Sequence, residues 1–214
     1  MKTSVILNLV LAIAVVVLGY KLVASNNGGN AGNAVSAENT AKQEGELKPF
    51  DVTESLDTHP FKFFTGDGLL LAAGDSTSSN AMTIGWGGLG TLWGKPTVTV
   101  YVREGRHTHE FMERSKYFTV MTFSDKSVLR YMGTHSGRDG DKAKALGLHT
   151  LYTANGTPYY AEADTVIECR TMWAGNLDKA GFRSDVPANF YEEHDDGNGL
   201  HTEYIGEVVS ALHR

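Results

Sequence analysis

Cysteine is almost missing from this chain, since Cys169 is the only one among 214 residues. A single thiol excludes a disulfide framework within the chain and any metal site built from several cysteines. It leaves the redox compartment open, because a protein without disulfides is stable in either environment. Cys169 lies in an apolar strand pattern, which is typical of a small core residue rather than of a nucleophile.

An excess of positive charge is also lacking. The formal net charge is −6 at pH 7, which argues against broad nucleic-acid binding, because that function needs a basic face. Local basic clusters can still bind one small anion. Hydrophobic residues make up 41% of the chain and charged residues 21%, so we expect a globular protein with one folded domain.

Familiar catalytic and metal-binding signatures are absent as well. The chain has no G-x-S-x-G elbow and no H-E-x-x-H pair, and His107 and His109 lie at an expected helix start. The acidic residues of segment 192–196 lack the regular alternation of an EF-hand loop, so we interpret them as a solvated loop. We therefore expect no metal site. Residue types leave a Ser-His-Asp or Cys-His arrangement open, but an enzyme whose cofactor carries the chemistry needs neither.

The N-terminus is informative about location. An apolar run from Val5 to Leu18, interrupted by one asparagine, follows Lys2 and has the length and order of a secretory signal. Read more generously, it approaches the roughly 20 residues that span a bilayer. No cysteine that accepts a lipid follows it. We expect residues 1–24 to be a signal peptide or a membrane anchor that meets the membrane, with the domain exported, periplasmic or membrane-tethered.

A composition shift separates this segment from the rest. Residues 25–46 are rich in Asn, Gly, Ala and Ser and have no apolar period, so we expect a flexible linker there. The folded domain is then expected over residues 47–214.

Short runs of β-branched and aromatic residues, separated by turn residues, dominate that domain. Strands are expected over residues 68–74, 96–102, 117–123, 163–175 and 203–213. The Asn155-Gly156 pair predicts a hairpin. Helices are expected over about 108–115, around 128–132 and, from a capping-box pattern, after Ser136. The pattern predicts a mainly β fold, an antiparallel β-barrel with helical insertions.

The string GWGGLG, from Gly85 to Gly90, satisfies the dinucleotide-binding pattern G-x-G-x-x-G. That motif requires a helix directly after it, so that the pyrophosphate meets a helix N-terminus. Gly94 and Pro96 preclude a helix here, and a strand pattern follows. We therefore interpret these glycines as allowing close approach of the backbone to a flat ring, or a bulge at a strand end.

Two separate elements are suited to anions. Arg103 ends an expected strand, and Thr108 is placed to cap the next helix with Arg106 just before it, so an oxyanion would meet dipole, hydroxyl and guanidinium together. A Ser-Gly-Arg loop from Ser136 followed by Lys142 forms the second element. Each alone is typical of a solvated surface turn. This small acidic domain contains both elements. It also contains the segment NAMTIGWG (80–87), which offers a backbone edge beside an aromatic residue. Together the three elements indicate a flavin nucleotide site.

At these residues the chain resembles the flavin reductase-like family, specifically the flavoredoxin branch of the FMN-binding split barrels. The resemblance rests on ordered motifs: N-x-M-T-x-x-W (80–86), W-x-K-P (93–96), Y-V-R-x-x-R-x-T-x-E-F (101–111), S-G-R-D-x-D-K (136–142), E-A-x-x-x-x-E-C (162–169) and H-x-x-Y-I-G-E (201–207). It implies a six-stranded, antiparallel split β-barrel of Greek-key type and a homodimer with FMN near the interface. It also implies an oxidoreductase that passes electrons from a donor, commonly NAD(P)H, through flavin to an acceptor.

The resemblance also implies roles for individual residues. His201 matches a histidine near the nicotinamide side and is the expected catalytic residue. Asn80 opens the first motif and belongs to the cofactor site. Met82, Thr83 and Ile84 are expected to line the isoalloxazine through backbone groups. The phosphate end is expected to be held by Arg103, Arg106 and Thr108, with Ser136, Gly137 and Lys142 closing over it.

Two departures from the family pattern matter. Gly85 stands where many relatives have Ser or Ala, which removes a hydroxyl from the flavin side. The apolar N-terminal run is the second, because nicotinamide nucleotides are cytoplasmic and an exported member needs another donor, such as a quinol pathway or a thiol protein. A non-catalytic exported flavin-binding electron carrier is therefore the alternative function.

Overall fold

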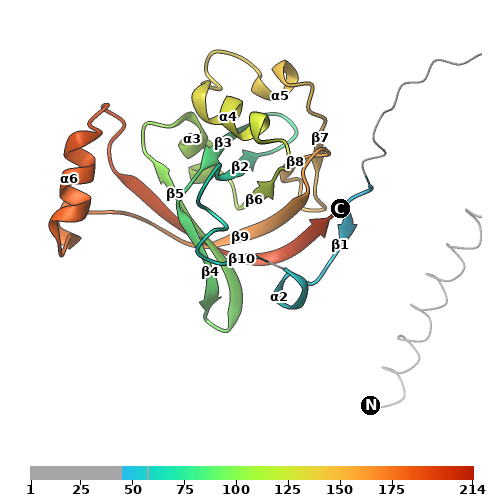
Figure 1. The fold of residues 1–214 in the computed structure, drawn as a ribbon, viewed down its shortest axis with the longest axis horizontal. Coiled ribbons are helices and arrows are strands. Elements are labelled where there is room, and N and C mark those ends of the chain that lie inside the picture. The colour runs from blue at the N-terminus through green and yellow to red at the C-terminus, as the bar shows by residue number, and fades with distance from the viewer. Residues whose placement is uncertain (1–44, 57) are drawn as a thin grey trace, which may run out of the picture. The chain divides into compact units, whose positions relative to one another are not determined.

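The computed structural model describes residues 45–56 and 58–214 (Figure 1). The predicted segment 1–24, and all but the last two residues of the predicted linker 25–46, lie outside the described residues. Within the described part, no helix has the length and apolar character needed to cross a membrane. In chain order the elements are β1 (Lys48–Pro49), α2 (Val52–Ser55), β2 (Leu69–Gly74), β3 (Ser79–Ile84), β4 (Gly87–Leu92), β5 (Lys95–Arg103), α3 (His107–Arg114), β6 (Tyr117–Thr122), α4 (Lys126–Thr134), α5 (Lys142–Ala145), β7 (Thr150–Tyr152), β8 (Pro158–Tyr160), β9 (Thr165–Asn176), the 3₁₀ helix η1 (Lys179–Gly181), α6 (Asp185–Glu193) and β10 (His201–His213).

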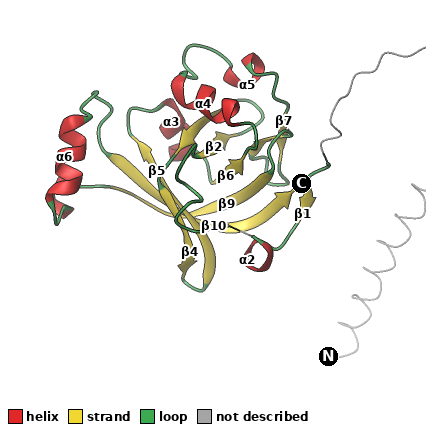
Figure 2. Cartoon of the chain, viewed as in Figure 1, coloured by secondary structure: helices red, strands yellow, loops and turns green. Residues whose placement is uncertain are grey.

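One antiparallel sheet forms the body of the domain (Figure 2). Its strands run in the order β3-β2-β6-β9-β10-β5-β4, and the short β1 pairs with β10 as the eighth strand. β3 and β4 end this path, so each has one backbone edge that no other strand of the described residues covers. The predicted mainly β, antiparallel fold with helical insertions is confirmed, with eight strands in the sheet where the resemblance implied six.

The five predicted strands correspond to β2, β5, β6, β9 and β10. The unbroken apolar run of β2 is explained by burial on both faces: Leu69 and Leu71 belong to one core cluster, while Leu70 belongs to the other. Because side chains alternate along a strand, successive residues serve the two clusters in turn. The second cluster is closed by Leu129 and Met132 of α4, which covers this part of the sheet.

The glycine-rich string enters strand β4 at Gly87, and the strand β5 follows it in place of the helix that a dinucleotide-binding motif requires. β4 pairs with β5 through a tight turn at Trp93 and Gly94, both with positive φ. A Cβ at Gly87 would lie 2.3 Å from the Phe64 ring and 2.4 Å from the Thr99 carbonyl oxygen. A glycine is therefore needed where this strand meets an aromatic ring of the chain itself.

The predicted hairpin at Asn155-Gly156 is confirmed as the β7–β8 connection, and Gly156 has φ +80°. It is fastened to the sheet by the carboxylate of Glu168, which is 1% exposed. That carboxylate accepts hydrogen bonds from three hairpin residues and from β10: Thr153 (2.6 Å), Asn155 (3.2 Å), Thr157 (2.7 Å) and Ser210 (2.9 Å). Neutral donors thus satisfy a buried charge.

The helix starts differ from those predicted. Thr108 is not the cap of α3, because Arg106 occupies that position and Thr108 lies inside the first turn. The third helix does not start after Ser136. It starts after Asp141, whose carboxylate accepts the Lys144 N–H at 3.0 Å, while the Ser136 hydroxyl accepts the Arg138 N–H in a local turn.

Helix α6 was not predicted at all. It lies in the connection between the long strands β9 and β10 and stands away from the other helices (Figure 1).

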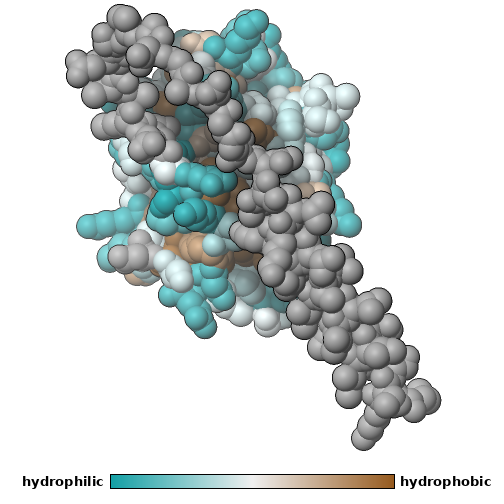
Figure 3. Space-filling view, turned by 90° about the vertical axis from the view of Figure 1, so that its right-hand side faces the viewer, coloured by the Kyte–Doolittle hydropathy of each residue, from teal (hydrophilic) through white to brown (hydrophobic). Residues whose placement is uncertain are grey.

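The face drawn in Figure 3 is mainly hydrophilic, with smaller hydrophobic areas between the polar ones.

Candidate functional site

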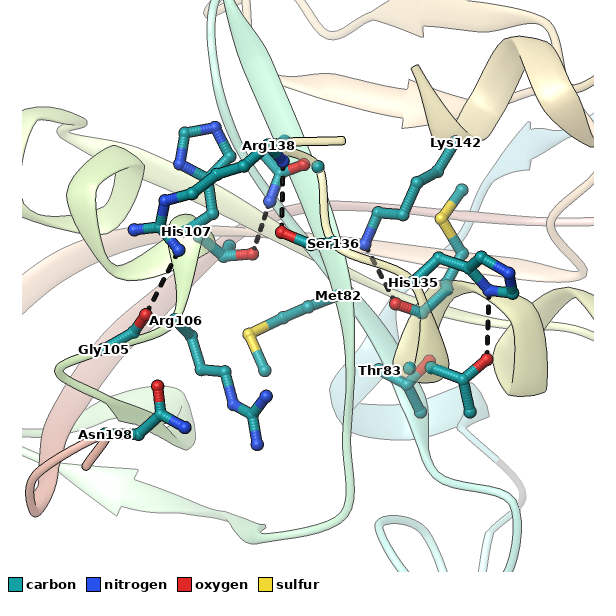
Figure 4. Close-up of a pocket in the computed structure, with 16 residues that line it drawn as sticks. Met82, Thr83, Gly105, Arg106, His107, His135, Ser136, Arg138, Lys142 and Asn198 are labelled. Atoms are coloured by element: carbon teal, nitrogen blue, oxygen red, sulfur yellow. Dashed lines mark hydrogen bonds between the residues drawn. The ribbon is translucent and has the colours of Figure 1, made fainter. Parts of the chain in front are cut away.

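A cavity of about 270 Å³ lies between β3, the start of α3 and the segment that joins α4 to α5 (Figure 4). We call it the basic cavity. Eight of the predicted site residues line it: Asn80, Met82, Thr83, Arg106, Thr108, Ser136, Gly137 and Lys142. Residues from segments far apart in sequence therefore meet in one place, as predicted.

A smaller cavity of about 150 Å³ adjoins it along β3 and shares Met82, Thr83 and Arg106 with it. We call this one the ring cavity. It is lined by the three remaining predicted residues, Ile84, Arg103 and His201, and by Trp86. Together the two cavities contain all eleven predicted site residues, arranged along the uncovered edge strand of the sheet.

Lys142 is the most unusual residue of the basic cavity. Its side chain is 8% exposed, and its Nζ donates to the Met132 carbonyl oxygen at 2.9 Å (Figure 4). Among the described residues no carboxylate lies within 4.0 Å of it, and burial lowers the pKa of Lys142 to about 8. A buried cation without a negative partner is costly in a folded protein, so this cavity is suited to an anionic ligand.

The start of α3 adds unpaired backbone donors. No side chain caps this helix, and the Arg106 carbonyl accepts only the His109 N–H of the first turn, at 2.9 Å. Within the described chain, the N–H groups of His107 and Thr108 have no hydrogen-bond acceptor. Uncapped N–H groups at a helix start, together with the helix dipole, favour an anion.

Gly137 fits closely against β3. A Cβ at this position would lie 2.1 Å from the Asn80 Oδ1 and 3.2 Å from a ring carbon of His107. The Asn80 amide in turn donates to the Thr108 hydroxyl at 2.8 Å, which links β3 to α3. A larger residue at this position would force either the Asn80 amide, which bonds Thr108, or the α4–α5 segment with Ser136 and Lys142 to move.

Arg103 requires a correction. Its guanidinium is 8% exposed and is occupied by the loop before β10: it donates to the carbonyl oxygens of Gly199 (2.9 and 3.1 Å) and His194 (3.2 Å) and pairs with Asp196 at 2.9 Å. Arg103 lines the ring cavity and not the basic cavity. Its position supports a role in holding this loop rather than the predicted phosphate.

Arg106 is the arginine that the basic cavity retains. It is about half exposed, and its nearest carboxylate is Asp196 at 3.8 Å. The predicted solvated loop over 192–196 is thus corrected twice, because residues 192 and 193 end helix α6 and Asp196 contacts both arginines. Arg138 also lines the basic cavity but pairs with Glu110 and donates to the Gly105 carbonyl, so its charge is already neutralised.

His201 lies in the ring cavity and is 8% exposed. Its ring centroid is 4.6 Å from that of Trp86, and its Nδ1 is 2.6 Å from the Tyr191 hydroxyl of α6. Burial, followed by the charges of Arg103 and Arg106, lowers the pKa of His201 to about 4. His201 is therefore a neutral imidazole at physiological pH.

Sequence reasoning missed Tyr191, His107 and Asn198, all of which lie at or beside the two cavities. The spacing of the motifs gives no signal for them. Tyr191 reaches His201 only because α6 folds back over the start of β10, and that helix was not predicted.

The comparisons with known proteins agree with this geometry. Residues 62–214 match the family model described as "Flavin reductase like domain". The chain belongs to this family. Among solved structures it is similar to the flavoredoxin of Methanosarcina acetivorans, with 21% identity and a TM-score of 0.52 over 68% of this chain and 67% of that chain. No curated protein sequence matches the chain.

Two further solved structures have the same fold. The flavoredoxin of Desulfovibrio vulgaris is 21% identical, with a TM-score of 0.52 over 68% of each chain. An FMN-binding protein of Thermus thermophilus is 16% identical, with a TM-score of 0.53 over 87% of this chain and 82% of that chain. At these identities the likeness establishes the split-barrel fold, and the predicted membership of the flavin reductase-like family is confirmed by the family model.

Proposed function

We propose that this member of the flavin reductase-like family binds FMN across the two cavities and acts as an oxidoreductase. The observation that carries the proposal is the buried cation Lys142, which has no carboxylate partner in the described chain and faces a cavity that also contains an uncapped helix start. A phosphate monoester is the anion that fits this donor set. Family membership supports flavin, and the similar solved structures include FMN-binding proteins.

The residues divide by cavity. Lys142, Arg106 and the first N–H groups of α3 would hold the phosphate, with Ser136 and Gly137 closing over it. The β3 backbone at Met82, Thr83 and Ile84 would lie along the isoalloxazine. When bound, flavin supplies hydride and electron transfer at its own ring. The chain then contributes binding, orientation and the neutral His201 beside that ring.

Several finer features belong to the same proposal. NAD(P)H is the expected donor for a cytoplasmic relative, whereas an exported domain would need a quinol-linked or thiol donor. We further propose export through the N-terminal segment and a homodimer with flavin near the interface. A non-catalytic flavin-binding electron carrier is the second candidate, because burial and the charges of Arg103 and Arg106 keep His201 neutral, and a neutral imidazole is a weak proton donor.

Binding of FMN and of riboflavin to the full chain tests the flavin site, since the two ligands differ only in the phosphate. We expect micromolar or tighter binding of FMN and much weaker binding of riboflavin. Lys142→Met should weaken FMN about 10- to 100-fold, the range for hydrogen bonds to a charged group, and leave riboflavin nearly unchanged. A wild-type chain that ignores FMN would reject the proposal.

Reduction of the flavin-loaded chain distinguishes the two candidate functions. Rapid mixing with NADH and with NADPH, followed by absorbance, should show fast bleaching with one of them if the chain is a flavin reductase. An electron carrier would be reduced by neither nucleotide but by a dithiol or a quinol analogue.

A further inference from the structure

The Tyr191–His201 pair is a short, buried polar contact at the ring cavity that the motifs do not explain. Both side chains are 8% exposed, and the Tyr191 Oη lies 2.6 Å from the His201 Nδ1. The pair joins helix α6 to the first residue of β10. Its hydrogen bond is therefore shielded from water while the rest of the imidazole borders the ring cavity.

The direction of this hydrogen bond follows from the available partners. In the described chain, the His201 Nδ1 is the one acceptor in reach of the Tyr191 hydroxyl proton, while the His201 backbone N–H faces the hydroxyl oxygen as a donor. A buried hydroxyl with one acceptor in reach donates to it, because its proton would otherwise remain unsatisfied. Burial raises the pKa of Tyr191 and lowers that of His201, so neither proton transfers to the other ring. The imidazole Nδ1 then accepts, and its proton is carried on Nε2.

The tyrosine itself is held on several sides. Its ring stacks parallel to Phe182, with centroids 5.9 Å apart and an angle of 5°, and meets Phe190 edge-on at 5.3 Å. The Arg103 guanidinium lies 5.8 Å above it and bonds the loop at His194 and Gly199. Trp86 packs against both the His201 ring and Phe190. The hydroxyl is thus presented in a fixed position.

We propose that Tyr191 is a positioning residue that fixes His201 in the Nε2–H tautomer and makes it a hydrogen-bond donor to the ring cavity. The effect on a bound flavin rests on the proposed function, whereas the Tyr191–His201 hydrogen bond and the tautomer do not. An N–H donor beside the ring favours the negative charge that the isoalloxazine gains on reduction. Tyr191 would in this way bias the bound cofactor toward its reduced form without touching it.

Imidazole nitrogen NMR on the flavin-free full chain tests the geometry directly. We expect the long-range ¹H–¹⁵N spectrum of His201, assigned by its loss in His201→Gln, to show a protonated Nε2 and an unprotonated Nδ1. In Tyr191→Phe, the same resonances should move toward a mixture of the two tautomers. Tyr131→Phe is the matched control, because Tyr131 stacks on His135 with centroids 3.8 Å apart while its hydroxyl is not hydrogen-bonded to that imidazole.

The relative affinity for oxidised and reduced FMN tests the consequence. Tyr191→Phe should lower the preference for the reduced form by about tenfold, equivalent to a fall of about 30 mV in the two-electron potential of the bound flavin. A wild-type His201 protonated on Nδ1, or unchanged tautomers in Tyr191→Phe, would overturn the proposal. If His201 shows the expected tautomers but the chain binds no FMN, the positioning role of Tyr191 stands and only the proposed flavin function is rejected.

Discussion

Lys142 is buried, and burial disfavours its charged form, so the charge lowers the free energy of unfolding of the flavin-free protein. The folded-state pKa of about 8 lies below the value of about 10.4 for an unfolded lysine, so between these values the unfolded chain binds more protons. The stability of the flavin-free protein should therefore rise with pH across this window and be reduced below it.

We expect Lys142→Met to remove this dependence and to stabilise the flavin-free chain at pH 7, although the same change weakens FMN binding. Urea denaturation at pH 7 and pH 9.5 provides the comparison. Lys144→Met, at an exposed lysine of the same helix, is the control and should behave like the wild type. Parallel stability curves for the wild type and Lys142→Met would contradict the assignment of a buried cation.

Gly137 makes the second prediction at this scale. An alanine would place its Cβ 2.1 Å from the Asn80 Oδ1, so either the α4–α5 segment shifts away from β3 or the Asn80 amide gives up its bond to Thr108. We expect Gly137→Ala to weaken FMN by at least about tenfold, because either movement displaces residues that line the basic cavity. Isothermal titration measures the loss. Gly181→Ala has open space around its Cβ and should bind FMN normally.

At the scale of elements, the loop between α6 and β10 depends on Arg103. Replacement by lysine keeps the charge but loses the planar fork that reaches both carbonyl oxygens and Asp196. We expect faster hydrogen exchange across residues 194–200 in Arg103→Lys, and an equal loss of affinity for FMN and riboflavin. If FMN affinity fell and riboflavin affinity did not, Arg103 would instead be a ligand of the FMN phosphate. Arg170→Lys, at a half-exposed arginine that pairs with Glu207 away from this loop, is the control.

The β7–β8 hairpin depends in the same way on Glu168. In Glu168→Gln, an amide N–H₂ group replaces one of the two oxygens and faces either the hydroxyls of Thr153 and Thr157 or the Asn155 amide and the Ser210 hydroxyl, so one buried donor meets another. Leaving such groups unsatisfied costs about 1–3 kcal/mol, and we expect a loss of this size in the free energy of unfolding by urea. Glu162→Gln breaks only a more exposed contact with His149 and should cost less than about 1 kcal/mol.

At the scale of the whole molecule, the strand pattern and the ordered motifs were sufficient to predict the fold and to place all eleven site residues in adjoining cavities. Alternation and turn residues are local signals, so β2, β5 and the hairpin at Gly156 follow from them. The role of Arg103 does not, because its partners lie more than ninety residues away in a loop whose position depends on α6. The Tyr191–His201 contact escapes prediction for the same reason.

The assembly of the whole molecule is the remaining prediction. Beside the ring cavity, an apolar groove of about 620 Å³ is lined by Phe61, Trp86 and Leu89, and Phe61 is 83% exposed. Exposed aromatic residues next to a binding site are typical of a covered surface. We expect light scattering of the full chain to give twice its mass of 23.2 kDa, and Phe61→Glu to shift it toward the monomer. Leu151→Glu, an exposed apolar position on β7, should leave the mass unchanged, and a wild-type monomer with FMN bound would exclude the dimer.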